Sequence, residues 1–146
     1  MKYKFGKIDL LCVGSIKRSD LYFVAQDEYK KRLTPYGKLT IMELDDENKL
    51  QKQMVQAAYK IAMTIDGNAY SSETFAQNLE KIGIMGNSHI QFIIGGADGL
   101  SDQTIALCNA KISLSKMTFT HHMARILLLE QIYRSVRLIN NEPYHK

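Results

Sequence analysis

Apolar and polar positions follow two different spacings along the 146-residue chain. Short apolar runs closed by turn residues predict buried strands, and apolar residues three and four positions apart predict the inner faces of helices. The strands are expected at 8–14, 39–44, 61–65, 89–94 and 111–114, and the helices at 21–33, 47–58, 72–82, 101–108 and 120–139. Regular alternation of strands and helices predicts an α/β fold with a mostly parallel sheet and helices on both faces. No linker, repeat or low-complexity segment interrupts this pattern, so residues 1–146 are expected to form one domain.

Polar and turn-forming residues indicate where the expected helices and strands begin and end. Asp20, Ser71 and Ser72 suit helix N-caps, because their side chains can accept hydrogen bonds from free backbone N–H groups. Asp45-Asp46-Glu47 places negative charge at a helix start, and Leu50, Met54, Ala57 and Ala58 give that helix its apolar face. Asp66-Gly67-Asn68 is a turn sequence and is expected to end the third strand.

Composition and charge narrow the functional classes only slightly. Hydrophobic residues make up 45% and charged residues 23% of the chain, which is typical of a globular protein rather than a disordered one. The net charge of +4 is compatible with a polyanionic partner, but taken alone it indicates an ordinary surface. Cys12 and Cys108 lie in apolar segments without metal-type spacing. With no signal-peptide or membrane-spanning pattern, a cytoplasmic protein without membrane attachment is expected.

The segment that follows the fourth strand, Gly95-Gly96-Ala97-Asp98-Gly99, is the first candidate site. It does not match the dinucleotide fingerprint, and no Gly-Lys-Ser/Thr follows as in a phosphate loop. Small residues here would let a ligand approach the backbone closely, or would simply allow a tight turn between strand and helix. From the glycines alone, the two interpretations are evenly balanced.

A second loop leaves the predicted sheet at Leu114-Ser115-Lys116-Met117-Thr118-Phe119. Apolar side chains beside small hydroxyls suit the wall of an adenine pocket, and they equally suit a strand end packed on the core. If both loops leave the same edge of a parallel sheet, they would form a ligand crevice.

The last helix and the tail carry the remaining candidates. His121 and His122 are adjacent and have no further ligand at helical spacing, so no metal site is expected. The helix has a broad apolar face, which favours a subunit interface. Glu130 can pair with Arg134 one turn later. The tail ends in Pro143-Tyr144-His145-Lys146, whose side chains suit base stacking, proton transfer and phosphate contact.

Taken together, these motifs resemble a known family. The run Phe92–Ser101, the run Leu114–His121 and the terminal Glu142-Pro143-Tyr144-His145-Lys146 are similar, in this order, to the RlmH family of ribosomal RNA methyltransferases, which belong to the SPOUT class. The resemblance covers essentially the whole chain. It implies a C-terminal trefoil knot, a rare exception to the rule against knotted folds. It further implies a homodimer that binds S-adenosylmethionine in the knot and methylates N3 of a pseudouridine in 23S ribosomal RNA of the assembled ribosome.

Position by position, the resemblance assigns cofactor contacts to one isoleucine, two glycines and the second loop: Ile65, Gly95, Gly96, Leu114, Ser115, Lys116, Met117, Thr118, Phe119 and Thr120. Methylation of an imide nitrogen requires loss of its proton, so we expect His145 or Tyr144 near the target base. Arg125 or Arg134 would hold a phosphate or stabilise the imide anion. Arg134, Arg137 and Lys146 are the candidate RNA contacts.

Two features of the sequence depart from the family pattern. Thr120 stands where the family commonly has proline, and the segment Asp45–Tyr59 is shorter than usual, which affects any RNA contact made there.

Two other functional classes are considered. A non-catalytic RNA- or ribosome-binding module would also fit the basic charge. An ordinary doubly wound nucleotide-binding or redox domain is disfavoured, because its glycine loop would follow the first strand.

Overall fold

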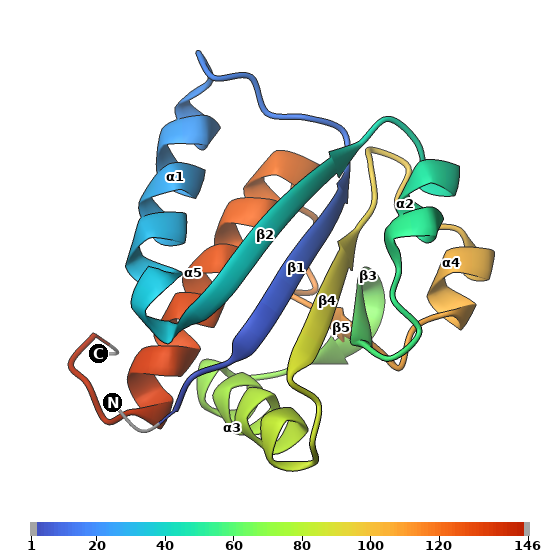
Figure 1. Cartoon of the computed structure of the whole chain (residues 1–146). Helices are drawn as coiled ribbons and strands as arrows, with labels where there is room; N and C mark the ends of the chain where they lie inside the picture. The colour runs from blue at the N-terminus through green and yellow to red at the C-terminus, as the bar shows by residue number, and fades with distance from the viewer. Residues whose placement is uncertain (1–2, 145–146) are drawn as a thin grey trace.

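The computed structural model describes residues 3–144 and forms one five-stranded sheet in the order β2-β1-β4-β3-β5 (Figure 1). All neighbouring strands are parallel, as expected. The strands are β1 Gly6–Val13, β2 Gly37–Leu44, β3 Tyr59–Ala69, β4 His89–Ile94 and β5 Ala110–Ser113. The helices are α1 Leu21–Leu33, α2 Glu47–Gln53, α3 Ser72–Ile84, α4 Asp102–Ala106 and α5 His121–Ile139, with a short 3-10 turn at Thr34–Tyr36.

Side-chain caps explain where the helices begin. Asp20 accepts from the Tyr22 N–H at 2.9 Å, Ser71 caps α3, and Ser101 caps α4. Thr120 caps α5 through the N–H of Met123. Thr120 therefore satisfies a backbone donor that would otherwise be free.

Two hydrophobic cores lie on opposite faces of the sheet because successive strand residues point to opposite sides. On one face, Leu10 of β1 and Phe92 of β4 pack against side chains of α3 and α5. On the other face, Leu11 and Ile93 pack against Leu50 of α2 in a smaller core. Figure 1 shows α2 and α4 covering only part of this second face, next to the carboxyl ends of the strands.

Two predicted boundaries are wrong for the same reason, since tertiary pairing overrides the local sequence. β3 runs on through Asp66-Gly67-Asn68 because Asn68 and Ala69 pair again with Ile112 and Ser113 of β5, after a register shift. α2 ends at Gln53, so Ala57 and Ala58 are not helical.

The segment after α2 is instead fixed to the sheet. The Gln91 side chain accepts from the Val55 N–H and donates to the Gln53 carbonyl. The ammonium of Lys60 donates to the carbonyls of Val55, Gln56 and Ala58. These polar contacts take the place of a longer helix.

The broad apolar face of α5 is largely used within the chain, because α5 lies between α1 and α3. The fully buried apolar residues of α5 are Leu128, Leu129, Ile132 and Val136. The width of that face is therefore explained by packing on both sides. Within residues 3–144, no helix is both long and apolar enough to cross a membrane.

Candidate cofactor and substrate site

The glycine-rich loop after β4 is held in a compact conformation. The Gly99 N–H donates to the Gly96 carbonyl at 3.0 Å, and Gly99 has φ +76°, which favours glycine. A Cβ atom on Gly95 would lie 2.6 Å from the Gly99 carbonyl carbon. Glycine at position 95 is thus required for the close approach of the loop to itself.

The exit of this loop is fixed by Glu47, the first residue of α2. Its carboxylate accepts hydrogen bonds from the N–H of Ser101 at 3.0 Å, from the Ser101 hydroxyl, and from the Thr104 hydroxyl at 2.6 Å. Burial acts to raise the pKa of Glu47, but the hydrogen bonds from Ser101 and Thr104 outweigh it and lower the pKa. This clamp between α2 and α4 was not expected from the sequence.

The second loop leaves the sheet at the end of β5. The Ser113 hydroxyl donates to the Ser115 carbonyl, and the Ser115 hydroxyl accepts from the Met117 N–H at 3.0 Å. Its outer residues are exposed, with Met117 at 75% and Phe119 at 38%. β3 lies between β4 and β5, so the two loops leave the same edge of the sheet but are not adjacent.

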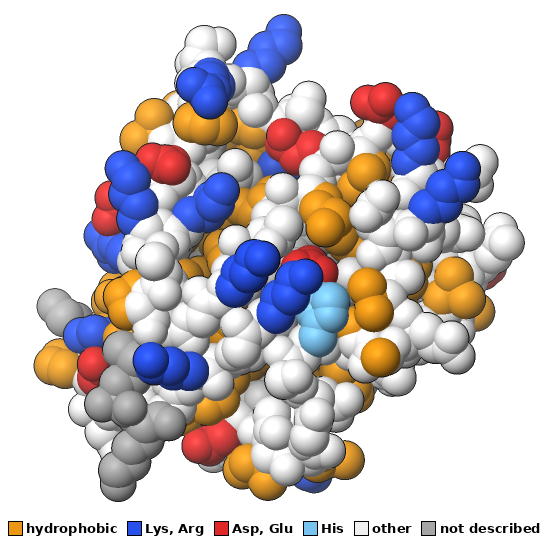
Figure 2. Space-filling model, viewed as in Figure 1, with side chains coloured by type: hydrophobic (Ala, Val, Ile, Leu, Met, Phe, Trp, Pro, Cys, Tyr) orange, Lys and Arg blue, Asp and Glu red, His pale blue; other side chains and the backbone are white. Residues whose placement is uncertain are grey.

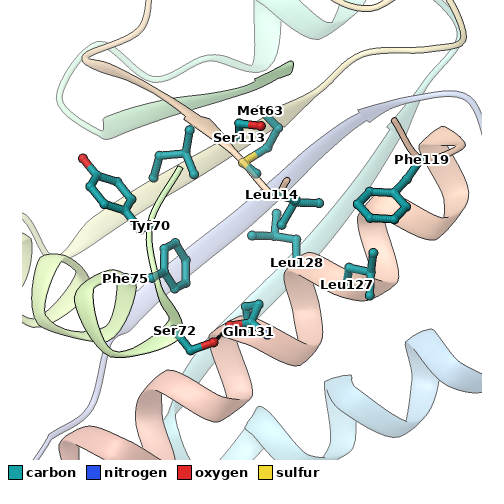
Figure 3. A pocket seen from close by; sticks show the side chains of 11 residues that line it. Met63, Tyr70, Ser72, Phe75, Ser113, Leu114, Phe119, Leu127, Leu128 and Gln131 are labelled. Carbon is teal, nitrogen blue, oxygen red and sulfur yellow. Dashed lines mark hydrogen bonds between the residues drawn. The ribbon is translucent and has the colours of Figure 1, made fainter. Parts of the chain in front are cut away.

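A cavity of about 240 Å³ lies between α3, α5 and the end of β5. Figure 3 shows side chains from these elements turned towards a common space. Its lining is mostly apolar, with a few polar groups: Met63, Tyr70, Ser72, Phe75, Ile112, Ser113, Leu114, Phe119, Leu127, Leu128 and Gln131. An apolar wall with few polar groups is typical of a cofactor site.

The expected cofactor residues fall into two groups. Leu114 and Phe119 line the cavity, whereas Gly95 and Gly96 belong to the neighbouring loop and do not. Ile65 lies in the part of β3 that is unpaired with β5, and its side chain is 68% exposed. Of the expected cofactor residues, the structure thus brings only Leu114 and Phe119 to the cavity; the other expected residues of the second loop do not line it: Ser115, Lys116, Met117, Thr118 and Thr120.

Arg125 lies far from solvent, with its side chain 1% exposed. It donates to Glu43 at 2.7 Å, to Gln26 at 2.9 Å and to the Gly14 carbonyl at 3.3 Å. A guanidinium held in this way has no access to an RNA phosphate in this conformation. Its position fits a structural role that joins α5 to α1, to β2 and to the residue after β1, and this geometry does not support the expected substrate contact.

The two histidines lie where the chain enters α5. Their rings contact each other at 4.4 Å between centroids, and the His122 ring contacts Tyr22 at 5.9 Å. Burial lowers the pKa of His121, and the neighbouring His122 and Arg125 act in the same direction. Among residues 3–144, no group of three or more His, Cys, Asp or Glu side chains is arranged to hold a metal ion.

The tail folds back along α5. The Tyr144 hydroxyl donates to Glu130 at 3.0 Å, and Arg134 lies over the Tyr144 ring at 4.8 Å. The expected pairing of Arg134 with Glu130 is confirmed, at 3.1 Å. Arg137 donates to the Pro143 carbonyl and to the Tyr36 hydroxyl, so it stabilises the tail. His145 and Lys146 lie outside the described residues.

Burial raises the pKa of Tyr144, and hydrogen bonding with Tyr29 and Glu130 raises it further. The phenol is therefore neutral around pH 7 and serves as a hydrogen-bond donor rather than a base. This removes one of the two candidates for taking a proton from the target base in this conformation.

A hydrogen-bonded chain links the cavity to the tail. Ser72 donates to Gln131 at 2.6 Å, and Gln131 donates to Glu130 at 3.0 Å. Glu130 then binds Tyr144. Sequence reasoning missed Ser72 and Gln131 as site residues; the available signal was a glutamine within the apolar pattern of α5.

A family model described as "Predicted SPOUT methyltransferase" matches residues 7–145. The chain belongs to this SPOUT methyltransferase family. The family resemblance expected from the sequence is therefore confirmed.

Similar SPOUT proteins come from several bacteria. The Clostridium perfringens protein named ribosomal RNA large subunit methyltransferase H 1 is 43% identical over 158 residues, covering 95% of this chain and 99% of the relative. The Clostridioides difficile protein of similar name is 42% identical with the same coverage.

Two solved structures share the fold of this chain at low sequence identity. A probable methylase family protein from Haemophilus influenzae has a TM-score of 0.57 at 10% identity, covering 98% of this chain and 71% of its own. A putative methyltransferase from Legionella pneumophila, solved with the cofactor SAM, has a TM-score of 0.52 at 13% identity, covering 92% of this chain and 68% of its own.

Proposed function

We propose that this SPOUT protein transfers a methyl group from S-adenosylmethionine to N3 of a pseudouridine in 23S ribosomal RNA of the large subunit, on assembled ribosomes. The main support is the apolar cavity beside the second loop, in a chain that matches rRNA methyltransferases over nearly its whole length. Bound S-adenosylmethionine supplies an electrophilic methyl group, so catalysis consists mainly of alignment and exclusion of water.

The cavity residues fit such a cofactor in chemical character. Phe119, Leu114 and Leu128 offer apolar contact for an adenine ring, while Ser72 and Gln131 offer polar groups at one side. Gly95 and Gly96 would contribute backbone groups from the adjacent loop, and Ile65 would cover the cofactor from β3. We further propose that the two loops and α5 form the trefoil knot of the family.

The acceptor side of the reaction is assigned to the tail. Arg134 and the neutral phenol of Tyr144 would orient the target base and stabilise the imide anion. The remaining protein candidate for a base is His145, and ionisation of the substrate itself could replace it. Lys146 of the tail and the partly exposed Arg137 of α5 are the proposed RNA contacts.

We propose that the active form is a homodimer in which the tail of one chain serves the cavity of the other. The tail packs on the side of α5 that faces α1, through Tyr29 and Tyr133, whereas the cavity opens on the side of α3. Within one chain Tyr144 therefore does not line the cavity and is linked to it only through Glu130 and Gln131. A second copy would bring a tail to the cavity directly.

The alternative is a non-catalytic RNA- or ribosome-binding module, and labelled-methyl transfer to ribosomes that lack the modification separates the two. We expect incorporation into large-subunit RNA that depends on S-adenosylmethionine and on Tyr144. Binding of ribosomes with no methyl incorporation and no calorimetric signal for S-adenosylhomocysteine would favour the module.

A further inference from the structure

Part of the sheet face opposite the cavity is left uncovered by helices. α2 packs over Leu11 and Ile93, near the carboxyl ends of β1 and β4. The segment after α2 then turns away across Gln91 and Lys60 towards β3. The amino-terminal half of β2, β1 and β4 therefore remains open on this face, and Figure 2 shows Lys or Arg side chains gathered there beside a histidine.

Three side chains form a row across this open face. Lys7 of β1 lies opposite Lys38 of β2 on one side and opposite His89 of β4 on the other. Adjacent strands are about 4.8 Å apart, so the row spans roughly 10 Å. We call Lys38, Lys7 and His89 the basic row.

Of the basic row, only His89 has an acidic partner within the described residues, since it contacts Asp9. Within residues 3–144, no carboxylate lies within ion-pair distance of Lys7 or Lys38. Asp9 lies on the same face, two positions along β1 from Lys7, and it is only 1% exposed. One of its carboxylate oxygens lies 2.6 Å from His89 and accepts from Gln91 at 3.0 Å. At the basic row itself, a polyanion would meet the two lysines, while the Asp9 carboxylate beside them is buried.

Like charges directly opposite each other on neighbouring strands destabilise a sheet. Lys7 and Lys38 are such a pair of opposed like charges on an uncovered surface. A lysine opposite an acidic residue would destabilise the sheet less. A ligand that carries repeated negative charge at close spacing removes this repulsion, and a nucleic-acid backbone is such a ligand.

We propose that the basic row binds the phosphate backbone of a second segment of ribosomal RNA, remote from the nucleotide that is methylated. The inference rests on the proposed function for the identity of the RNA. Because the row and the cavity lie on opposite faces of the sheet, the row cannot contact the target base of its own chain. Its role is to hold the enzyme on a large RNA surface.

The test uses the full-length protein, with Lys7→Gln/Lys38→Gln as the variant and Lys52→Gln/Lys81→Gln as the control. Lys52 and Lys81 are exposed lysines of α2 and α3, so both double variants lose the same net charge. The basic-row variant should raise KM for unmodified ribosomes on the order of tenfold, with kcat and KM for S-adenosylmethionine unchanged. The slope of log affinity against log salt should fall by roughly 1 to 2 for two lost phosphate contacts. The control should match the wild type.

Misfolding is excluded by thermal unfolding, because removing two opposed charges should leave Tm equal or raise it. Co-sedimentation with ribosomes gives a readout that does not need catalysis. If the wild type binds ribosomes through the basic row but transfers no methyl group, the proposed function fails while this inference stands. Equal binding by the wild type and the basic-row variant, or equal weakening in the control, would overturn the inference. So would weakened binding to ribosomes with unchanged binding to protein-free ribosomal RNA, since the partner would then be a protein.

Discussion

At the scale of single residues, the site depends on a few positions where only one side-chain size or charge fits. Gly95 faces the backbone of Gly99 at a distance that no side chain tolerates. Gly83 in α3 is different, because a Cβ atom there would meet only a Tyr3 ring carbon at 3.9 Å. A side chain at position 95 would therefore overlap the backbone, whereas a side chain at position 83 would fit.

Gly95→Ala should distort the loop and lower the free energy of unfolding by about 1–3 kcal/mol, because the added methyl group overlaps backbone atoms that cannot move aside easily. The matched change Gly83→Ala should be neutral or stabilise by about 0.5–1 kcal/mol, since alanine favours helix. Urea unfolding measures both, and calorimetry with S-adenosylhomocysteine should show weaker binding for Gly95→Ala alone. Equal stability of the two variants would contradict the assigned packing.

Arg125→Met tests whether this arginine is structural. Its buried guanidinium joins Glu43, Gln26 and the Gly14 carbonyl, and breaking such a pair by removing one partner costs about 3 kcal/mol. We expect a loss of this size in urea unfolding, with kcat retained for the fraction that is folded. A drop in kcat without loss of stability would restore the substrate contact that the sequence indicated.

At the scale of elements, α2 acts as a clamp on the glycine-rich loop. Glu47 receives three hydrogen bonds from Ser101 and Thr104, and Gln51 donates to Thr104 at 2.8 Å. The short helix α2 thus determines where the glycine-rich loop after β4 ends and α4 begins.

Glu47→Ala should weaken binding of S-adenosylhomocysteine several-fold and lower stability by about 1–2 kcal/mol, because Ser101 and Thr104 lose a charged acceptor. The pKa of Glu47 is lowered in the folded chain, so its contribution is complete above the pKa of the unfolded chain, about 4.3. It is lost as the pH falls through the lower folded value. Unfolding free energies of wild type and variant should therefore converge in acid. Asp45→Ala, in the same segment, is the control and should not change cofactor binding.

At the scale of the whole molecule, Tyr144 of the tail does not line the cavity of its own chain, and the proposed homodimer would bring the tail of one chain to the cavity of the other. The first turns of α1 and α5 lie together through Tyr22 and His122. They expose Leu21 at 75%, Val24 at 69% and Met123 at 37%. This apolar surface is the proposed contact between copies.

Mixing two inactive variants tests the shared site. Tyr144→Ala removes the tail phenol, and Leu127→Arg fills the cavity from its partly exposed wall; each should lack activity alone. In a symmetric dimer, a one-to-one mixture after subunit exchange should regain about a quarter of the wild-type activity, because mixed dimers hold one intact site. Leu21→Glu/Val24→Glu should give a monomer by light scattering and abolish this rescue. No rescue from a mixture shown to contain mixed dimers would place both halves of the site in one chain.

Local sequence determined the order of the elements, the parallel sheet, the helix caps and the two loops, because periodicity and capping act between residues close in the chain. The family membership also followed from short motifs that survive in order. Tertiary structure alone decided the length of β3, the early end of α2, the burial of Arg125 and the link from Ser72 through Gln131 and Glu130 to Tyr144. It also decided that Lys7 and Lys38 stand side by side on an open face. The physical reason is register: which residues of distant strands and helices meet depends on pairings that no local pattern specifies.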